Sequence, residues 1–71
     1  MSRVADPPAL VKISVAARVL GVDERTVRGW VEAGRMDIFQ FRPGSMRYVR
    51  AEELNRFAAR IGLETRWGEA L

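Results

Sequence analysis

Two arginines, Arg25 and Arg28, are the side chains whose spacing best suits recognition chemistry. They lie three positions apart, so in a helix both guanidinium groups fall on one face. A guanidinium stays charged at neutral pH and donates paired hydrogen bonds to phosphate and to the acceptor edge of guanine. The pair therefore indicates contact with a polyanion, although the same pattern also occurs on ordinary solvated helix faces.

A helix that holds this pair is predicted from Glu24 to about Ala33. Apolar side chains occupy the face opposite the arginines, Asp23 precedes the helix as a capping residue, and Gly34 ends it. The outward face also carries a glycine and a glutamate. The apolar positions are Val27, Trp30 and Val31, and the other outward positions are Gly29 and Glu32.

A first helix is predicted just before this one. Ser14 is expected to be its N-cap, and Gly21 ends it because glycine enters the left-handed conformation without steric cost. Its inward stripe consists of Val15, Ala16, Val19 and Leu20. Two helices joined by a glycine turn, the second with a cationic outer face, form the helix-turn-helix arrangement. In that arrangement the second helix enters the DNA major groove.

A β-hairpin is predicted after Gly34. Aromatic and β-branched residues are dense in 36–41 and 46–49, on either side of a Pro43-Gly44 turn. The tip is expected to project a basic finger beside the second helix, formed by Arg42, Ser45 and Arg47. Alternatively, the hairpin covers the core with Ile38 and either Tyr48 or Val49 facing inward, and both roles are compatible because strand residues alternate faces.

A last helix is predicted from about Arg50 to Gly62. Its apolar face is expected to close the core against Trp30 and Leu20, and two glutamates in its first turn suit the positive end of the helix dipole. That face consists of Leu54, Phe57, Ala58 and Ile61, and the glutamates are Glu52 and Glu53. The adjacent glutamates point about 100° apart and so do not form a shared acid/base site.

The resulting organisation is an arm at 1–10, a single domain at 11–62 and a tail at 63–71. The arm is expected to be flexible because it contains two consecutive prolines and no periodicity. The tail carries Trp67 and Leu71. Its tryptophan is expected either to pack against its own domain or to be offered to a protein partner.

Composition narrows the function further. The 71 residues include no cysteine and no histidine, so disulfides, the usual zinc ligands and the commonest catalytic base are excluded, and neither a cofactor nor an enzymatic reaction is expected. The net charge of +3 is concentrated in the middle of the chain, with +2 in residues 11–35 and +2 in residues 36–50. No apolar run suits a membrane span or a signal peptide, so a cytoplasmic, nucleoid-associated protein is expected.

The order of these elements resembles the excisionase family, small relatives of the MerR-type DNA-binding domain. The resemblance covers roughly residues 12–61. It rests on ISVAA at 13–17, LGV at 20–22, TVRGW at 26–30, EAGRM at 32–36, RYV at 47–49, and Glu53-Leu54 with Phe57. The wing is longer than is usual in the family, with an apolar ridge from Phe39 to Phe41.

The resemblance implies a mainly α winged helix-turn-helix fold with a small β-hairpin wing. It also implies a recombination directionality factor, which binds adjacent sites on double-stranded DNA cooperatively, bends the DNA and directs an integrase to excise a mobile element. A small MerR-like transcriptional regulator is the alternative, and a protein-binding module is a third reading. No membrane or small-molecule substrate is expected.

The expected DNA contacts come from three parts of the chain. Arg25 and Arg28 reach base edges or phosphates from the second helix, where Gly29 shares their face. Thr26 and Lys12 contact phosphates at the helix starts. Arg42, Ser45 and Arg47 engage the neighbouring minor groove or backbone from the wing. Self-association along DNA is expected because a module of this size binds weakly alone.

Overall fold

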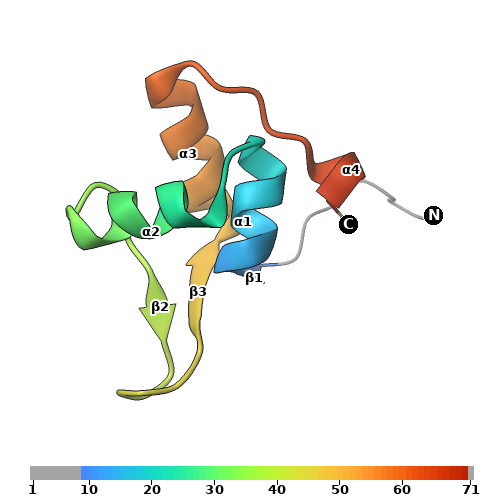
Figure 1. Cartoon of the computed structure of the whole chain (residues 1–71). Coiled ribbons are helices and arrows are strands. Elements are labelled where there is room, and N and C mark those ends of the chain that lie inside the picture. The colour runs from blue at the N-terminus through green and yellow to red at the C-terminus, as the bar shows by residue number, and fades with distance from the viewer. Residues whose placement is uncertain (1–8, 71) are drawn as a thin grey trace.

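The computed structural model describes residues 9–70 and has the expected winged helix-turn-helix architecture (Figure 1). Three helices form the body, a three-stranded sheet lies at one side, and a short fourth helix follows. In chain order the elements are β1 (Leu10–Lys12), α1 (Ile13–Leu20), α2 (Glu24–Glu32), β2 (Phe39–Gln40), β3 (Arg47–Arg50), α3 (Ala51–Ile61) and α4 (Trp67–Ala70).

The turn between α1 and α2 is built as the sequence predicts. Gly21 adopts the left-handed conformation with φ of 72°, and its N–H donates to the carbonyl of Arg18. The N–H of Val22 donates to the carbonyl of Ala17 at 3.0 Å. These two bonds satisfy carbonyls that the end of α1 would otherwise leave unpaired. The chain thus reverses within a few residues and places α2 directly against α1.

The predicted N-caps were only partly correct. Lys12, not Ser14, is the N-cap of α1, because β1 passes directly into the helix and Ser14 already lies in the first turn. Asp23 is the N-cap of α2, as predicted, but its carboxylate makes no capping bond. Its backbone carbonyl instead accepts from the N–H groups of Thr26 and Val27.

The core lies where the three helices and the sheet meet. Its largest fully buried side chains come from all of these elements and are Val19, Val27, Val49, Leu54 and Phe57. The rings of Trp30 and Phe57 pack with centroids 4.8 Å apart, which joins α2 to α3 as expected. Burying each of these large apolar side chains contributes about 1.5–3 kcal/mol relative to exposure.

The sheet contains a strand that the sequence did not predict. Its order is β1-β3-β2 with antiparallel pairing throughout, and Val11 of β1 is paired with Val49 of β3. The N–H of Ala51 also donates to the carbonyl of Ala9 at 2.9 Å. Ala9 and Leu10, although part of the predicted arm at 1–10, are therefore attached to the domain. The rest of that arm, residues 1–8, lies outside the described residues.

The wing is a hairpin whose β2 strand is shorter than predicted. Phe39 is paired with Tyr48, and Gln40 with Arg47. The strand begins at Phe39, where pairing with β3 starts, and the Met36 side chain, 2% exposed, belongs to the core. The Pro-Gly turn forms as expected: the N–H of Ser45 donates to the carbonyl of Arg42 at 3.0 Å, and Gly44 has φ of 86°.

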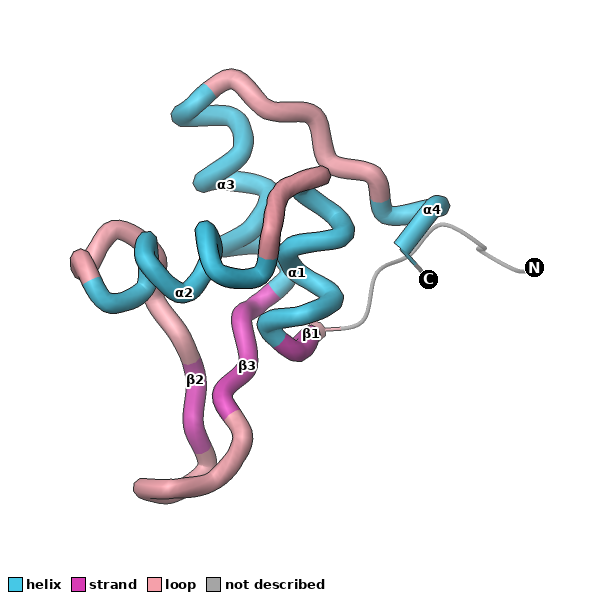
Figure 2. The backbone as a smooth tube through the Cα atoms, viewed as in Figure 1, coloured by secondary structure: helices cyan, strands magenta, loops and turns pink. Residues whose placement is uncertain are grey.

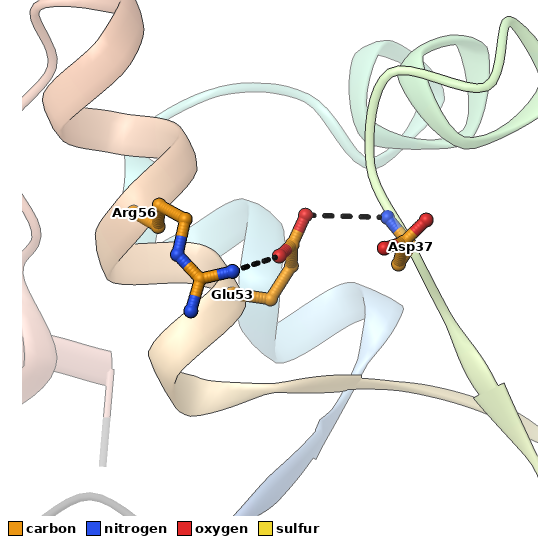
Figure 3. Close-up of polar contacts among 3 residues, drawn as sticks. All are labelled: Asp37, Glu53 and Arg56. Carbon is orange, nitrogen blue, oxygen red and sulfur yellow. Dashed lines mark hydrogen bonds and ion pairs between the residues drawn. The ribbon is translucent and has the colours of Figure 1, made fainter.

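A buried carboxylate fastens the base of the wing to α3 (Figure 3). Glu53 is 9% exposed, and its Oε2 accepts the backbone N–H of Asp37 at 3.3 Å. Its other oxygen accepts from Nη1 of Arg56 at 3.4 Å. The sequence assigned Glu53 only to the helix dipole, whereas the structure shows that it also ties the α2–β2 connection to the helix behind it.

The tail folds back over α1, and α4 lies beside that helix (Figure 2). The N–H of Arg66 donates to the carbonyl of Val19 at 2.8 Å, and the indole N–H of Trp67 donates to Oδ1 of Asn55 at 2.9 Å. The Trp67 ring packs against the core cluster. Of the two alternatives, Trp67 therefore contacts its own domain, while Leu71, the other tail residue expected at a partner, lies outside the described residues.

The Glu53 contact predicts an asymmetric effect of two neighbouring substitutions. Glu53→Ala leaves the Asp37 N–H without its acceptor and is expected to lower the free energy of unfolding by about 1–2 kcal/mol. Glu52→Ala removes an exposed carboxylate from the same helical turn and is expected to change it by less than about 0.5 kcal/mol. Urea denaturation followed by circular dichroism measures both, and equal losses would contradict the role assigned to Glu53.

Candidate nucleic-acid interface

The outward face of α2 is held in position by its buried face. Val27 is fully buried, and Trp30 packs against Phe57 of α3, so the helix cannot rotate without opening the core. The side chains on the opposite face are consequently directed to solvent. Arg25, Thr26, Arg28 and Gly29 are all exposed, as the sequence predicted.

A basic depression lies beside this face, where the starts of α1 and α2 meet the wing. It has a volume of about 410 Å³. Three of the predicted DNA contacts line it, one from each region: Lys12 before α1, Arg28 on α2 and Arg47 on β3. The remaining lining residues are Ile13, Ser14, Glu24 and Met46. We call this region the basic groove.

One carboxylate partly offsets the charge of the basic groove. Oε2 of Glu24 pairs with Nη2 of Arg28 at 2.7 Å, one helical turn apart, and the two side chains are 41% and 53% exposed. An exposed pair of this type contributes only about 0.3–0.5 kcal/mol. Exchange of Glu24 for a phosphate or a guanine edge is therefore inexpensive, and the groove keeps a surplus of positive charge from Lys12 and Arg47.

The other predicted contacts fall outside the basic groove. Arg25, Thr26 and Gly29 extend the surface along α2, while Arg42 lies at the wing tip. Ser45 serves the turn: its hydroxyl donates to the carbonyl of Arg42 at 2.8 Å and accepts the N–H of the same residue at 3.2 Å. This hydroxyl has no second hydrogen to donate to DNA, so its predicted contact is restricted to accepting a hydrogen bond or to van der Waals contact.

Two exposed residues that line the basic groove were not predicted from the sequence. Ser14 was interpreted as a helix cap, but the unpredicted strand β1 moves the helix start and leaves its side chain exposed at the groove. Met46 was counted as part of a strand, but it is 54% exposed and lies beside Arg47. In the sequence, only its position two residues after the Pro-Gly turn marks Met46 as a candidate for the surface.

Nothing among the described residues requires glycine at position 29. It lies within α2 on the exposed face, and a Cβ placed there would have no atom within 4 Å from its surroundings. Glycine inside a helix costs roughly 0.5–1 kcal/mol relative to alanine. A glycine beside Arg25 and Arg28 is consistent with close approach of the α2 backbone to an external ligand.

The described part of the chain contains neither a metal-binding cluster nor a membrane-spanning helix. No cluster of carboxylates there could hold a metal ion, and no helix there has the length and apolar character to cross a membrane. Besides Ile13, Glu24 and Met46, the residues that line the basic groove are two arginines, a lysine and a serine. Such side chains bind phosphates and base edges through hydrogen bonds and charge.

Comparison with known protein families agrees with this geometry. A family model described as a helix-turn-helix domain matches residues 10–61. The chain belongs to this helix-turn-helix family. The match begins at β1 and ends at the last residue of α3, so it includes both helices of the motif and the wing, and excludes α4. Neither the curated proteins nor the solved structures gave a match.

Membership of this family makes the protein a DNA-binding helix-turn-helix domain. In such domains the second helix of the motif, here α2, docks in the major groove while neighbouring elements contact the backbone. The basic groove lies between α2 and the wing.

Glu24 is predicted to weaken DNA binding by competing for Arg28. Glu24→Gln breaks the ion pair and removes a negative charge from the basic groove, so DNA affinity is expected to rise by roughly three- to tenfold at low salt. Glu64→Gln, in the segment between α3 and α4, changes the net charge equally and serves as the control. Fluorescence anisotropy with a labelled duplex measures both variants. Equal gains for the two would show that only net charge matters.

Gly29→Ala is predicted to separate stability from binding. Alanine is expected to raise the free energy of unfolding by about 0.5–1 kcal/mol, because it favours the helix and meets no neighbouring atom. Its methyl group lies on the DNA-facing side and is expected to lower DNA affinity. Thermal denaturation and anisotropy report the two effects separately, and a more stable variant with unchanged affinity would place Gly29 outside the interface.

Proposed function

We propose that this protein is an excisionase, a recombination directionality factor that binds several adjacent DNA sites, bends the DNA and directs an integrase to excise a mobile element. The main support is the basic groove, because side chains of α2 and of the wing line this one depression. The residues that resemble the excisionase family include Arg28 and Arg47 of this surface, and Leu54 and Phe57 of the core behind it.

Binding by several copies follows from the size of this surface. A single module of this type buries only about 600–1,000 Å² on DNA, so one copy binds weakly and useful occupancy requires neighbouring copies. Contact between copies can use opposite charges. Glu52 at the start of α3 is exposed, whereas Glu53 is engaged inside the domain, so Glu52 is the first-turn carboxylate of α3 that can reach a neighbour's arginines.

The proposed action is binding without catalysis. Arg25 and Arg28 read base edges from the major groove, while Thr26 and Lys12 hold phosphates near the helix starts. Arg42 and Arg47 place the wing along the adjacent minor groove or backbone. The protein supplies DNA geometry, and the strand exchange itself belongs to the integrase.

Two arginines are predicted to affect binding in different ways. Arg28→Ala is expected to relax sequence preference, with a loss of about 1–3 kcal/mol on the preferred site and little on random DNA. Arg47→Ala is expected to weaken binding to all sequences and to reduce the slope of log affinity against log salt by about one unit. Arg60→Ala, on α3 away from the basic groove, is the charge-matched control.

The biological role is tested by footprinting and by an excision assay. On the attachment site of a neighbouring mobile element, the protein is expected to protect several adjacent sites in register. It is also expected to make excision by that element's integrase efficient in a reconstituted reaction. A single protected site at a promoter, with excision unaffected by the protein, would instead identify a small MerR-like transcriptional regulator.

A further inference from the structure

Of the large apolar side chains in the described residues, the two most exposed lie at the wing tip. Among the described residues, three large apolar side chains are exposed: Phe41 at 68%, Met46 at 54% and Ile61 at 36%. The two most exposed flank the Arg42–Ser45 turn, at the end of a hairpin that extends away from the helical body (Figure 1). Neither contributes to the core cluster, so packing does not explain them.

Phe41 is held in a fixed position although it is exposed. Its ring meets the ring of Phe39 edge-on with centroids 4.9 Å apart, and the ring of Tyr48 edge-on at 5.9 Å. Phe39 and Tyr48 are directly paired across β2 and β3, and Arg50 lies over the Phe39 ring at 5.4 Å. These contacts support one side of the Phe41 ring and leave its remaining surface accessible to a ligand.

Charge indicates the kind of ligand. Residues 38–51 contain three arginines and no acidic residue. Met46 and Arg47 also line the basic groove, which places the apolar tip in continuity with the DNA-binding surface. Proteins that bind the minor groove combine basic side chains with apolar ones that contact the bases. The apolar tip and its neighbouring arginines therefore suit the minor groove of a duplex.

We propose that Phe41, assisted by Met46, is a wedge that the wing inserts between two stacked base pairs from the minor groove, kinking the DNA. Minor-groove proteins use Phe and Met in this way, and each insertion bends the duplex toward the major groove. Arg42 and Arg47 hold the flanking phosphates while the step opens. The inference rests on the proposed DNA-binding function and assigns its bending activity to two side chains.

The test compares Phe41→Ala, Met46→Ala and the double variant with the wild-type protein on a duplex selected from a random pool. Ile61→Ala is the matched control, since it removes an exposed apolar side chain from α3. All four variants change only exposed side chains, so the fold is expected to persist, and circular dichroism verifies this. Bending is measured by energy transfer between the duplex ends, and unstacking by 2-aminopurine placed along the flank of the footprint.

Wild type and Ile61→Ala are expected to bend the duplex and to raise 2-aminopurine fluorescence at one step. The double variant is expected to lose a kink of roughly 20° or more together with that fluorescence signal. A mismatch at the same step lowers the cost of unstacking. Wild type should therefore bind the mismatched duplex about tenfold more tightly than the matched one, and the double variant should lose this preference.

Other outcomes overturn the proposal in distinguishable ways. Equal bending and equal 2-aminopurine signals in the double variant and wild type would reject the wedge and leave DNA binding intact. Loss of cooperativity between bound copies, with the bend per copy unchanged, would assign Phe41 and Met46 to a contact between proteins. Failure of wild type to bind any duplex at low salt would reject the proposed function itself, and the wedge with it.

Discussion

The DNA-binding surface depends on the packing of α2 against α1 and α3. Val27 is fully buried and Trp30 lies against Phe57, so the orientation of α2 is set by apolar contacts on one side only. Arg25 and Arg28 lie three positions apart, and burial of Val27 between them directs both outward. A small domain without disulfides has little other means of fixing a helix, and loosening this contact would destabilise the core and disorder the reading face together.

The helices and turns that carry this surface were predicted well because they depend on local periodicity. Both helices of the motif, the Gly21 turn and the Pro43-Gly44 turn follow from side-chain spacing and backbone preference, and all four are confirmed. Strand β1 was missed because three residues are too few to show a period, and its stability comes from pairing with β3, distant in sequence. That omission also explains the wrong cap at Ser14, since the helix begins directly where the strand ends.

Polar contacts between residues distant in sequence were the part that the sequence could not predict. The role of Glu53 depends on the path of the chain after α2, which brings the Asp37 N–H to within 3.3 Å of it. The periodicity of α3 predicts on which face of the helix Glu53 lies. It does not predict that the Asp37 N–H donates to its carboxylate. The attachment of Trp67 to Asn55 is similar, because the tail must first pass over α1. The Glu24–Arg28 pair is local, and its i,i+4 spacing was visible in the sequence.

Several features of the surface cost stability within the domain and become favourable only on a ligand. Gly29 weakens α2, and Phe41 and Met46 expose apolar side chains to water. All three belong to α2 or the wing, whereas α3 is amphipathic and ends in a regular glycine cap. A chain stabilised only by a small core tolerates few such costs. Their concentration on the two elements that face DNA is therefore better explained by binding than by folding.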